Sequence, residues 1–407
     1  MSENWRSSTW GEEISLEYGK SNRTYNVEKG RFRVYGSNGP IGWTDTALVN
    51  EPGVILGRKG AYRGVQFSST PFFVIDTAYY VKPKNDNDIK WLYYAIISDK
   101  LGEIDDGSPI PSTTRSAVYV REIEVPPIKE QTAISSILSA LDDKIDLNRR
   151  TNETLEAMAR ALFRDWFVDF GPTRAKMAGE APYLAPELWE LFPDRLDDEG
   201  KPEGWQSLSL ADLAILSKSS INPAQFSDEY FLHFSLPAFD KGMMPDLVKG
   251  EEIKSGKFSL PNNSILLSKL NPETPRVWMV TAHEEPYQRI CSTEFMVLNP
   301  LQKDWLALIY CACLSQPFRE TLQGMVTGTS KSHQRVQPLA VMQTHLLHAT
   351  DILMRQFGLT AQPLFAKINF NRNESNTLAQ LRDLLLPKLM SGEISIRDAE
   401  KMVEDAA

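Results

Sequence analysis

The chain has 407 residues, of which 42% are hydrophobic and 24% are charged, and its net charge is −9. This composition is typical of a globular protein and excludes a disordered or fibrous one, and the length predicts two or more domains. No apolar run is long enough to cross a bilayer, and no signal-peptide pattern is visible. Cys291, Cys311 and Cys313 form no CxxC pair, so we expect no disulfide framework, no zinc site and a cytoplasmic location.

Residues 1–127 are predicted to form a mixed α/β domain. Short β-like runs occur at Gly53–Leu56 and Phe72–Val81, and turns rich in glycine, proline and asparagine separate them. A helical pattern covers Ile89–Lys100. The alternation of strands with single helices therefore favours a compact domain over a helical bundle.

A long helix is predicted over residues 128–170. Pro126 and Pro127 precede it, and proline at the first helical position loses no needed hydrogen bond. Alternating steps of four and three residues then define a heptad seam, which is typical of a coiled coil. The seam residues are Ile134, Leu138, Leu141, Ile145, Asn148, Asn152, Leu155, Ala159, Leu162 and Trp166.

Residues 171–204 are rich in proline, glycine and acid, and we interpret them as a mostly irregular linker with one short helix near Pro186–Leu191. Residues 205–340 then repeat the mixed pattern, with β-like runs at Ile265–Lys269 and Phe295–Leu298 and a helix at Trp305–Leu314.

Residues 341–407 are predicted to contain a second long helix and a C-terminal tail. The second seam contains Phe357, Ala361, Leu364, Ile368, Asn371, Ser375, Leu378, Arg382, Leu385 and Leu389. Gly358 and Pro363 are expected to disrupt the start of this helix, and Pro387 is expected to end or kink it.

An internal repeat relates the two halves of the chain. Residues 143–149 match 366–372 at an offset of 223, and the second seam follows from the first at the same offset. Val54–Leu56 matches Ser264–Leu266 at an offset of 210, and Trp91-Leu92 matches Trp305-Leu306 at 214. A period this long indicates duplicated domains.

The predicted fold class is therefore α+β, with a pseudo-two-fold internal repeat. Two mixed α/β domains are separated by two long antiparallel helices that form a coiled coil. Polar residues occupy the same two central places of each seam, Asn148 and Asn152 in one and Asn371 and Ser375 in the other. We expect these polar residues to fix the register of the pair.

No enzyme motif withstands inspection, so we expect no catalytic residue. Asp194, Glu199 and Lys201 have the order of a metal-dependent nuclease site but lie in a polar stretch. Gly324–Ser332 lacks the Gly-Lys-Ser/Thr of a phosphate loop, and Gly36–Gly42 lacks GxGxxG spacing. His345 and His348 have no third metal ligand nearby.

Two sets of polar and basic residues are candidates for contact with DNA. In the first half they are Asn38, Arg58, Lys59, Arg63, Ser112, Thr113 and Arg115, and in the second half they are Lys269, Asn271, Arg276, Thr329, Ser330, Lys331 and Arg335. Arginine can hold guanine or phosphate through two hydrogen bonds, and asparagine can hold adenine. Glycine turns with solvated charges, or helix caps, remain the structural alternative.

The helix sequences resemble those of a known family. Lys129–Gln131, Leu141–Ala159 and Trp166–Phe170 resemble the central conserved region of the specificity subunits of type I restriction-modification enzymes, and Leu384–Ile394 resembles their second conserved region. Gly36–Gly42 and Ile55–Gly64 resemble a common kind of target-recognition domain. The resemblance covers nearly the whole chain, although residues 205–340 match more loosely.

This resemblance implies two target-recognition domains that each read one half of a split double-stranded DNA site. It also implies that the helices set the spacer and dock two methyltransferase (modification) subunits, and that two restriction/translocase subunits join for cleavage. S-adenosylmethionine, ATP and Mg would then be bound by those partners, and the chain itself would need no cofactor. The segment 128–204 carries 16 acidic and 10 basic residues, which suggests that basic partners help to hold DNA.

Two other functions remain open from the sequence. A standalone nuclease or methyltransferase would require a cofactor motif, and the sequence shows none. A coiled-coil scaffold would not need two large turn-rich domains. Genes for a methyltransferase and an ATPase beside this one would favour the specificity subunit over both alternatives.

Overall fold

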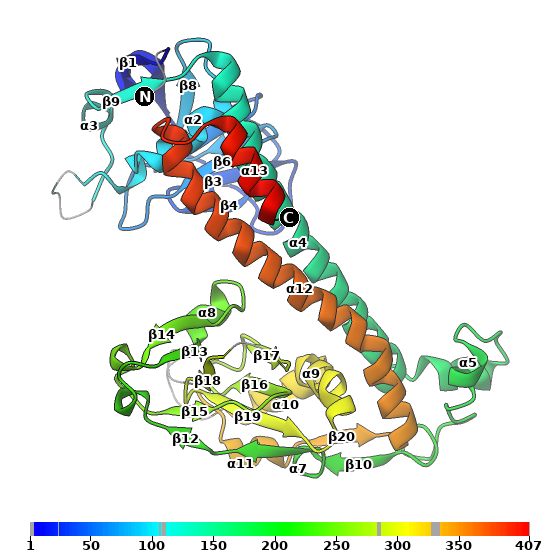
Figure 1. Cartoon of the computed structure of the whole chain (residues 1–407). Helices are drawn as coiled ribbons and strands as arrows, with labels where there is room; N and C mark the ends of the chain where they lie inside the picture. The colour runs from blue at the N-terminus through cyan, green and yellow to red at the C-terminus, as the bar shows by residue number, and fades with distance from the viewer. Residues whose placement is uncertain are drawn as a thin grey trace. The chain divides into compact units, whose positions relative to one another are not determined.

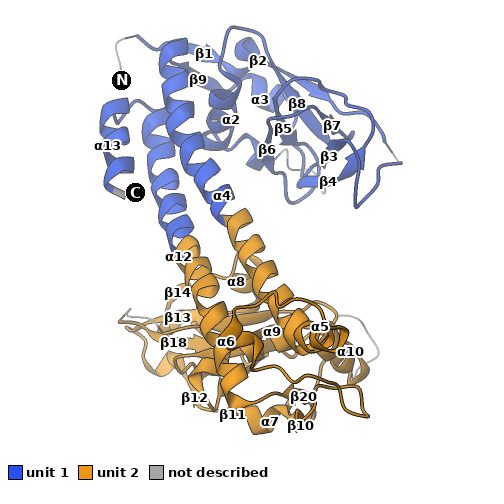
Figure 2. Ribbon diagram, turned by 90° about the vertical axis from the view of Figure 1, so that its right-hand side faces the viewer, with its two compact units in different colours: residues 1–148, 373–407 blue, residues 149–372 orange. Residues whose placement is uncertain are grey.

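The computed structural model describes residues 4–22, 24–105, 107, 111–282, 286–326 and 334–406. It divides into two compact units, the first made of residues 1–148 and 373–407 and the second of residues 149–372 (Figure 2). The boundary falls inside the two long helices, α4 (Ile128–Phe167) and α12 (Asp351–Met390), so each unit contains part of both. No helix in the described ranges has the length and hydrophobicity to span a membrane.

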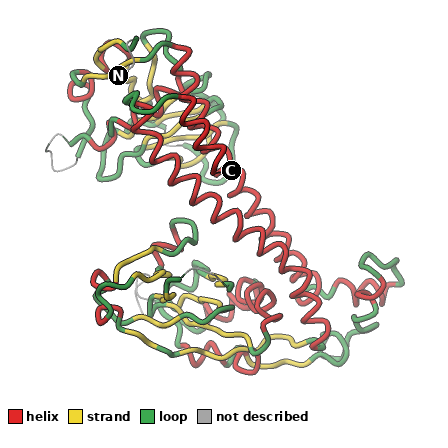
Figure 3. Tube along the Cα trace, viewed as in Figure 1, coloured by secondary structure: helices red, strands yellow, loops and turns green. Residues whose placement is uncertain are grey.

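The first unit combines nine strands with short helices among its described residues (Figures 1 and 3). The strands are β1 (Arg6–Thr9), β2 (Ile14–Tyr18), β3 (Phe32–Gly36), β4 (Gly39–Thr44), β5 (Gly53–Gly57), β6 (Val65–Ser68), β7 (Phe72–Val74), β8 (Ala78–Pro83) and β9 (Glu122–Val125). The helices are α1 (Trp10–Glu13), α2 (Ile89–Ser98), α3 (Arg115–Tyr119) and α13 (Ile396–Ala406), with a 3-10 turn at Leu101–Glu103.

The core of the first unit lies between one sheet and its helices. The strand orders are β2-β8-β5-β6, β4-β3-β7 and β1-β9. Helix α2 packs on β5 and β6 and buries Trp91, Leu92 and Ile96, which join Trp10 in one apolar cluster. Burying each such side chain contributes about 1.5–3 kcal/mol.

The second unit repeats this arrangement, with a sheet of five strands where the first unit has a sheet of three. Its strands are β10 (Gln206–Ser209), β11 (Ala214–Ser217), β12 (Ser220–Ile221), β13 (Tyr230–Phe234), β14 (Asp246–Lys249), β15 (Lys257–Ser259), β16 (Ser264–Ser268), β17 (Val277–Val280), β18 (Gln288–Cys291), β19 (Phe295–Pro300) and β20 (His345–His348). Its helices are α5 (Gly171–Ala178), α6 (Pro186–Trp189), α7 (Leu210–Leu213), α8 (Leu236–Asp240), α9 (Leu306–Leu314), α10 (Gln316–Gly324) and α11 (Pro338–Met342), with 3-10 turns at Pro223–Gln225, Gly250–Glu252 and Lys303–Trp305.

The strand pairing confirms the internal repeat. The sheet β11-β19-β16-β17 has the order of β2-β8-β5-β6, and β10-β20 corresponds to β1-β9. Both copies begin alike, because α1 and α7 each start with a capping box, formed by Thr9 with Glu12 and by Ser209 with Asp212. The mixed α/β class and the duplication predicted from the sequence are therefore confirmed.

The register of the repeat differs by one residue from the sequence alignment. Gly57 pairs with Ala78, and Ser268 pairs with Phe295, at the same place in the two sheets. The offset here is therefore 211, and the predicted offset of 210 was wrong. The error matters because a slip of one residue exchanges the two faces of a strand. A short run of aliphatic residues, buried on both faces, gives no alternation that could have prevented it.

Two expected elements also differ from the structure. The run Phe72–Val81 is not one strand, because a turn over residues 75–77 separates β7 from β8. The segment 171–204 contains α5 in addition to the expected short helix, α6. Pro172 in the first turn and Gly179, whose φ is +69°, supply the start and stop signals of α5.

The two long helices pair through the predicted seams within each unit. In the first unit the seam buries Ile134, Leu138, Leu141, Leu378, Leu385 and Leu389, with Ile145 packed against them. In the second unit it buries Ala159, Trp166, Phe357, Ala361 and Ile368, with Leu155, Leu162 and Leu364 packed against them. The pairing confirms the coiled-coil prediction.

The central polar residues of the two seams meet as expected. In the first unit, Asn148 Nδ2 donates to Glu374 Oε2 at 2.6 Å and to Ser375 Oγ at 3.3 Å. In the second unit, Asn371 Nδ2 donates to Asn152 Oδ1 at 2.9 Å. A shift of the helices would bury these groups beside apolar neighbours at a cost of about 1–3 kcal/mol each, so they favour one register.

Helix α12 runs without a break through the residues expected to disrupt it, so that expectation was wrong. Gly358 is required by packing, because a Cβ there would lie 2.0 Å from the backbone oxygen of Asp304. Pro363 costs about 3 kcal/mol in a helix interior. The buried side chains of Ala361 and Phe365, on either side of it, contribute packing that offsets that cost.

A buried polar network joins the first domain to the start of α4. Glu13, which is fully buried, accepts hydrogen bonds from Arg6, Ser8, Asn85 and Asn87. Gln131 Nε2 in turn donates to Asn87 Oδ1 and to the backbone oxygen of Pro126, both at 2.9 Å. The network fixes α1, the loop before α2 and the first turn of α4 together.

Glu13→Gln is expected to lower the free energy of unfolding of the first unit. It is also expected to make that free energy less dependent on pH in the acidic range. Burial alone would raise the pKa of Glu13, but the hydrogen bonds outweigh it and lower the pKa from 4.5 to about 2. The ionised group therefore stabilises the folded chain above its unfolded pKa, by up to about 3 kcal/mol, and this contribution is lost as the pH falls from 4.5 toward 2. Denaturant unfolding at several pH values measures it. Glu28→Gln, at an exposed position, is the matched control; equal effects of the two variants would contradict the prediction.

Candidate nucleic-acid interface

Three segments of the first unit meet at the end of β5. They are the β3–β4 turn, the loop after β5 over residues 58–64, and residues 111–115 before and at the start of α3. The Gly64 amide donates to Ser37 O at 2.8 Å, and the Thr113 amide donates to Arg58 O at 2.9 Å. Lys59 and Ser112 form an isolated antiparallel bridge. Residues far apart in the sequence are thus brought to one place.

Glycines make the close contact between these segments possible. A Cβ at Gly57 would lie 2.2 Å from Ser37 O and 2.8 Å from the Cα of Arg63. Gly60 has φ +108°, a backbone conformation that residues other than glycine rarely adopt. The glycine-rich pattern therefore packs the loop against its own chain.

Arg63 and Thr113 hold the loop in position. The Arg63 guanidinium donates to three backbone oxygens, from Nη1 to Gly60, from Nε to Gly102 and from Nη2 to Ile104, at 2.7, 3.0 and 2.8 Å. Thr113 is fully buried. Both residues were predicted to contact DNA, and in this structure they are occupied with internal contacts.

Arg58 and Arg115 lie over one tyrosine. The guanidinium carbon of Arg115 is 4.3 Å from the centre of the Tyr18 ring, and that of Arg58 is 5.2 Å from it. Tyr79 packs against Tyr18 with ring centres 5.0 Å apart. Neither tyrosine was predicted from the sequence, where each is only an aromatic side chain in a run of β type.

The exposed side chains around this cluster come from the same segments. Asn38, at the β3–β4 turn, and Lys59 are exposed, and Tyr62 keeps 77% of its surface accessible. Basic, amide and aromatic groups on one surface are the groups that contact phosphates and base edges. The arrangement can bind an anionic polymer, and it offers no nucleophile with an adjacent base.

The second unit has an equivalent junction at the end of β16. Leu270 and Arg335 form an isolated bridge, and the Val336 amide donates to Lys269 O at 3.1 Å. Lys269 therefore occupies the place of Arg58, and Arg335 occupies the place of Ser112. Arg335 therefore corresponds to Ser112 and not to Arg115.

The candidate DNA-contact residues of the second unit differ in whether they are paired with carboxylates. Arg276 pairs with both carboxylate oxygens of Asp240, at 2.7 and 3.0 Å, and Arg335 Nη2 lies 2.9 Å from Glu294 Oε1. Asn271, with φ +50°, shapes the turn after Lys269. Thr329, Ser330 and Lys331 lie outside the described residues.

The remaining chemistry-bearing groups form no reaction centre where the structure describes the chain. No cluster of three His, Cys, Asp or Glu side chains suited to a metal occurs there. Burial raises the pKa of the three free thiols, so they are protonated at neutral pH. Lys201 pairs with Asp197 and Glu199, which closes the nuclease-like stretch into an ion-paired turn.

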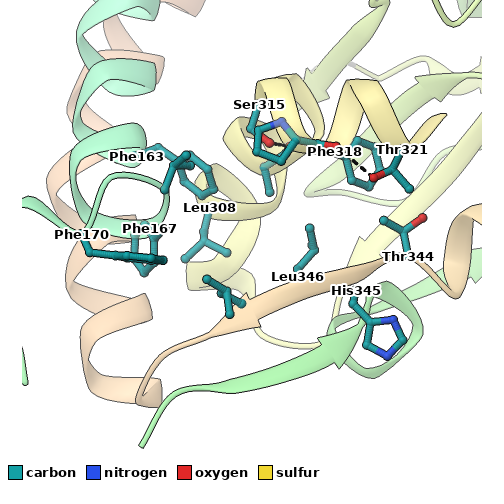
Figure 4. A pocket seen from close by; sticks show the side chains of 14 residues that line it. Phe163, Phe167, Phe170, Leu308, Ser315, Phe318, Thr321, Thr344, His345 and Leu346 are labelled. Atoms are coloured by element: carbon teal, nitrogen blue, oxygen red, sulfur yellow. Dashed lines mark hydrogen bonds between the residues drawn. The ribbon is translucent and has the colours of Figure 1, made fainter. Parts of the chain in front are cut away.

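A cavity of about 220 Å³ in the second unit is mainly apolar (Figure 4). Phe163, Phe167 and Phe318 contribute rings to it. The hydroxyls of Ser315 and Thr321 donate to backbone oxygens one turn away in the chain. These two hydroxyls are therefore engaged with the backbone of their own segments.

Comparison with known proteins gives a consistent result. Residues 13–157 match the family model of the type I restriction modification DNA specificity domain. Over 331 residues the chain is 27% identical to the type I restriction enzyme MjaIX specificity subunit of Methanocaldococcus jannaschii, covering 78% of this chain and 71% of the relative. Over 381 residues it is 24% identical to the HindI specificity subunit of Haemophilus influenzae, covering 79% and 81%.

A solved structure shares the fold. The S subunit of a type I restriction-modification system from M. genitalium aligns with a TM-score of 0.60 and 16% identity, over 95% of this chain and 96% of that one. At this identity the likeness concerns the fold alone. It agrees with the duplicated α/β domains and the long helices described above.

Proposed function

We propose that this chain, which resembles type I restriction-modification specificity subunits in sequence and in fold, selects the DNA sequence on which such a complex acts. The observation that carries the proposal is the duplicated junction, at the end of β5 in one unit and of β16 in the other. Two such junctions, each within its own domain, suit a DNA site made of two halves.

Each junction is assigned one half of the site. In the first unit, Asn38, Arg58, Lys59, Ser112 and Arg115 contact DNA, whereas Arg63 and Thr113 keep the loop in shape. In the second unit, Lys269 and Asn271 contact DNA together with Thr329, Ser330 and Lys331. Arg276 and Arg335 contribute less charge to DNA, because each is paired with a carboxylate.

The chemistry of the complex is assigned to partner subunits. Two methyltransferase subunits dock on the exposed faces of α4 and α12, and two restriction/translocase subunits join them. S-adenosylmethionine, ATP and Mg are bound by these partners, which methylate adenine and cleave DNA with ATP. The acidic surplus of residues 128–204 supports docking of basic surfaces beside the DNA.

The purified chain alone is expected to transfer no methyl group from S-adenosylmethionine to DNA, because no reaction centre was found in its described residues. The chain assembled with its methyltransferase subunits is expected to methylate specific sites. Labelled methyl transfer measures both, with the methyltransferase subunits alone as the control. Methylation by the chain alone would support the standalone enzyme, and site-specific methylation by the subunits without it would support the scaffold.

A further inference from the structure

The guanidinium of Arg115 is held by a hydrogen bond from Nε and by an aromatic ring against one face. Its Nε donates to the backbone oxygen of Leu16 at 2.6 Å, and its guanidinium carbon lies 4.3 Å from the centre of the Tyr18 ring. Tyr18 itself keeps 49% of its surface accessible. Nε is anchored and the guanidinium lies over the ring, which leaves the two terminal nitrogens, Nη1 and Nη2, as the outward end of the side chain.

The carboxylate beside Arg115 binds it weakly. Oε2 of Glu17 lies 3.7 Å from Nη2, beyond hydrogen-bond distance, and both side chains are more than one third exposed. An exposed ion pair of this kind contributes about 0–1 kcal/mol. Arg58 lies near the same ring and has Nη2 bonded to the backbone oxygen of Asp76 at 2.9 Å. The positive charge around Tyr18 thus exceeds the charge of Glu17.

A planar pair of donors in a fixed orientation matches the O6 and N7 atoms of guanine in the major groove. It also matches a phosphate, which has the same acceptor geometry. The fixed plane favours the base, because base edges demand a defined direction whereas a phosphate accepts donors from several directions. A backbone anchor and a ring beneath the guanidinium supply that direction.

The second unit does not repeat this device. Helices α3 and α11 have five residues each and follow equivalent bridges, and Pro338 stands at the first position of α11 where Arg115 stands in α3. Lys218 follows β11 at the place that Tyr18 has in β2. At these two described positions, the second unit therefore has neither the arginine nor the tyrosine of the first.

We propose that Arg115 reads a guanine in the half-site recognised by the first unit, and that Tyr18 is the positioning residue that orients its guanidinium. This inference rests on the proposed function. It predicts that the first half-site contains a G·C pair read by Arg115. The second half-site is read by other side chains. The two halves of the recognised sequence are thus chemically unlike.

The first arm of the test changes the protein within the assembled methyltransferase. Arg115→Lys keeps the charge and loses the fork, so it is expected to relax one G·C position in methylation maps while the salt dependence of binding is retained. Tyr18→Leu is expected to relax the same position in part. Arg397→Ala, an exposed arginine on α13, is the control and should leave the recognised sequence unchanged.

The second arm changes the DNA and leaves the protein intact. Replacing one guanine of the first half-site by 7-deazaguanine, which lacks N7, is expected to lower affinity roughly 5- to 150-fold. Inosine keeps O6 and N7 and should bind normally in the major groove. The Arg115→Ala complex should no longer distinguish 7-deazaguanine from guanine.

The outcomes separate the alternatives. If Arg115→Ala weakens binding to all sequences equally and lowers the salt slope by about one unit, the ligand is a phosphate and the proposal is overturned. The same holds if no guanine of the half-site responds to 7-deazaguanine. A wild-type complex that methylates without sequence preference would instead overturn the proposed function itself.

Discussion

A chimera whose residues 1–127 come from a relative is expected to recognise a new sequence in one half of its site and the original sequence in the other. The three segments that form the first junction, residues 36–39, 57–64 and 111–115, all lie within the exchanged part. The second junction and the polar contacts of Asn148 and Asn152 with α12 lie outside it. The change in specificity should therefore be confined to one half-site.

The expected effect is large. Each changed base pair in a site costs about 1–3 kcal/mol, so three changed pairs lower affinity for the original site on the order of a hundredfold to a millionfold. Methylation mapping of the assembled enzyme gives the new sequence directly. The reciprocal exchange of residues 205–340 is the control and should alter the other half. A chimera that alters both halves, or neither, would show that the domains do not read independently.

The join of the chimera must respect the buried network. Gln131 of α4 donates to Asn87 of the first domain, and Glu130 accepts a hydrogen bond from the Trp5 indole at 3.1 Å. A donor domain that lacks Asn87 would leave Gln131 with a buried unpaired group, which costs about 1–3 kcal/mol. Donors that carry asparagine and tryptophan at these places separate a change in recognition from a loss of stability.

The long helices were predictable because their signal is local and repeated. Ten seam positions at heptad spacing define each helix, and the matched polar positions predicted a polar register point at the centre. The structure forms it by pairing Asn148 with Ser375 and Asn152 with Asn371. Gly358 could not be interpreted in the same way. Its role depends on the backbone oxygen of Asp304, a neighbour that no pattern around residue 358 indicates.

The junction of the first unit was predictable in its membership and not in its roles. Arg58, Lys59, Ser112 and Arg115 were all expected near DNA, and the structure brings them together. Arg63 looked equivalent to Arg58 in the sequence, yet its partners are three backbone oxygens. Backbone acceptors have no residue-type signature, so a structural arginine cannot be told from a ligand-binding one by composition.

Adding one heptad to each long helix is expected to lengthen the unread spacer of the recognised site and to leave both half-sites unchanged. The pairing of Asn148 with Ser375 places Ile145 opposite Leu378, because the helices are antiparallel. Matched insertions therefore belong between Ile145 and Asn148 in α4 and between Ser375 and Leu378 in α12. This choice keeps every buried seam residue and the hydrogen bonds of Asn148 and Asn152 with their present partners, and it separates the ion pair of Lys144 with Glu374.

The expected change follows from helix geometry. Seven residues at 1.5 Å each add about 10 Å, which corresponds to about three base pairs at 3.4 Å. Three base pairs also rotate the far half-site by about 100°, since one turn of DNA takes 10–10.5 base pairs. Methylation mapping, which reports the spacer itself, is therefore preferred to affinity for any single sequence.

A heptad inserted in α4 alone is the matched control. It would place Ile145 and the residues before it seven positions out of register with Leu378 and Leu385, so the seam of the first unit could no longer close. We expect this variant to lose assembly or stability, whereas the doubly extended chain retains both. An active, doubly extended enzyme with an unchanged spacer would mean that the helices do not set the distance between the half-sites. The helices would then be longer while the spacer kept its length.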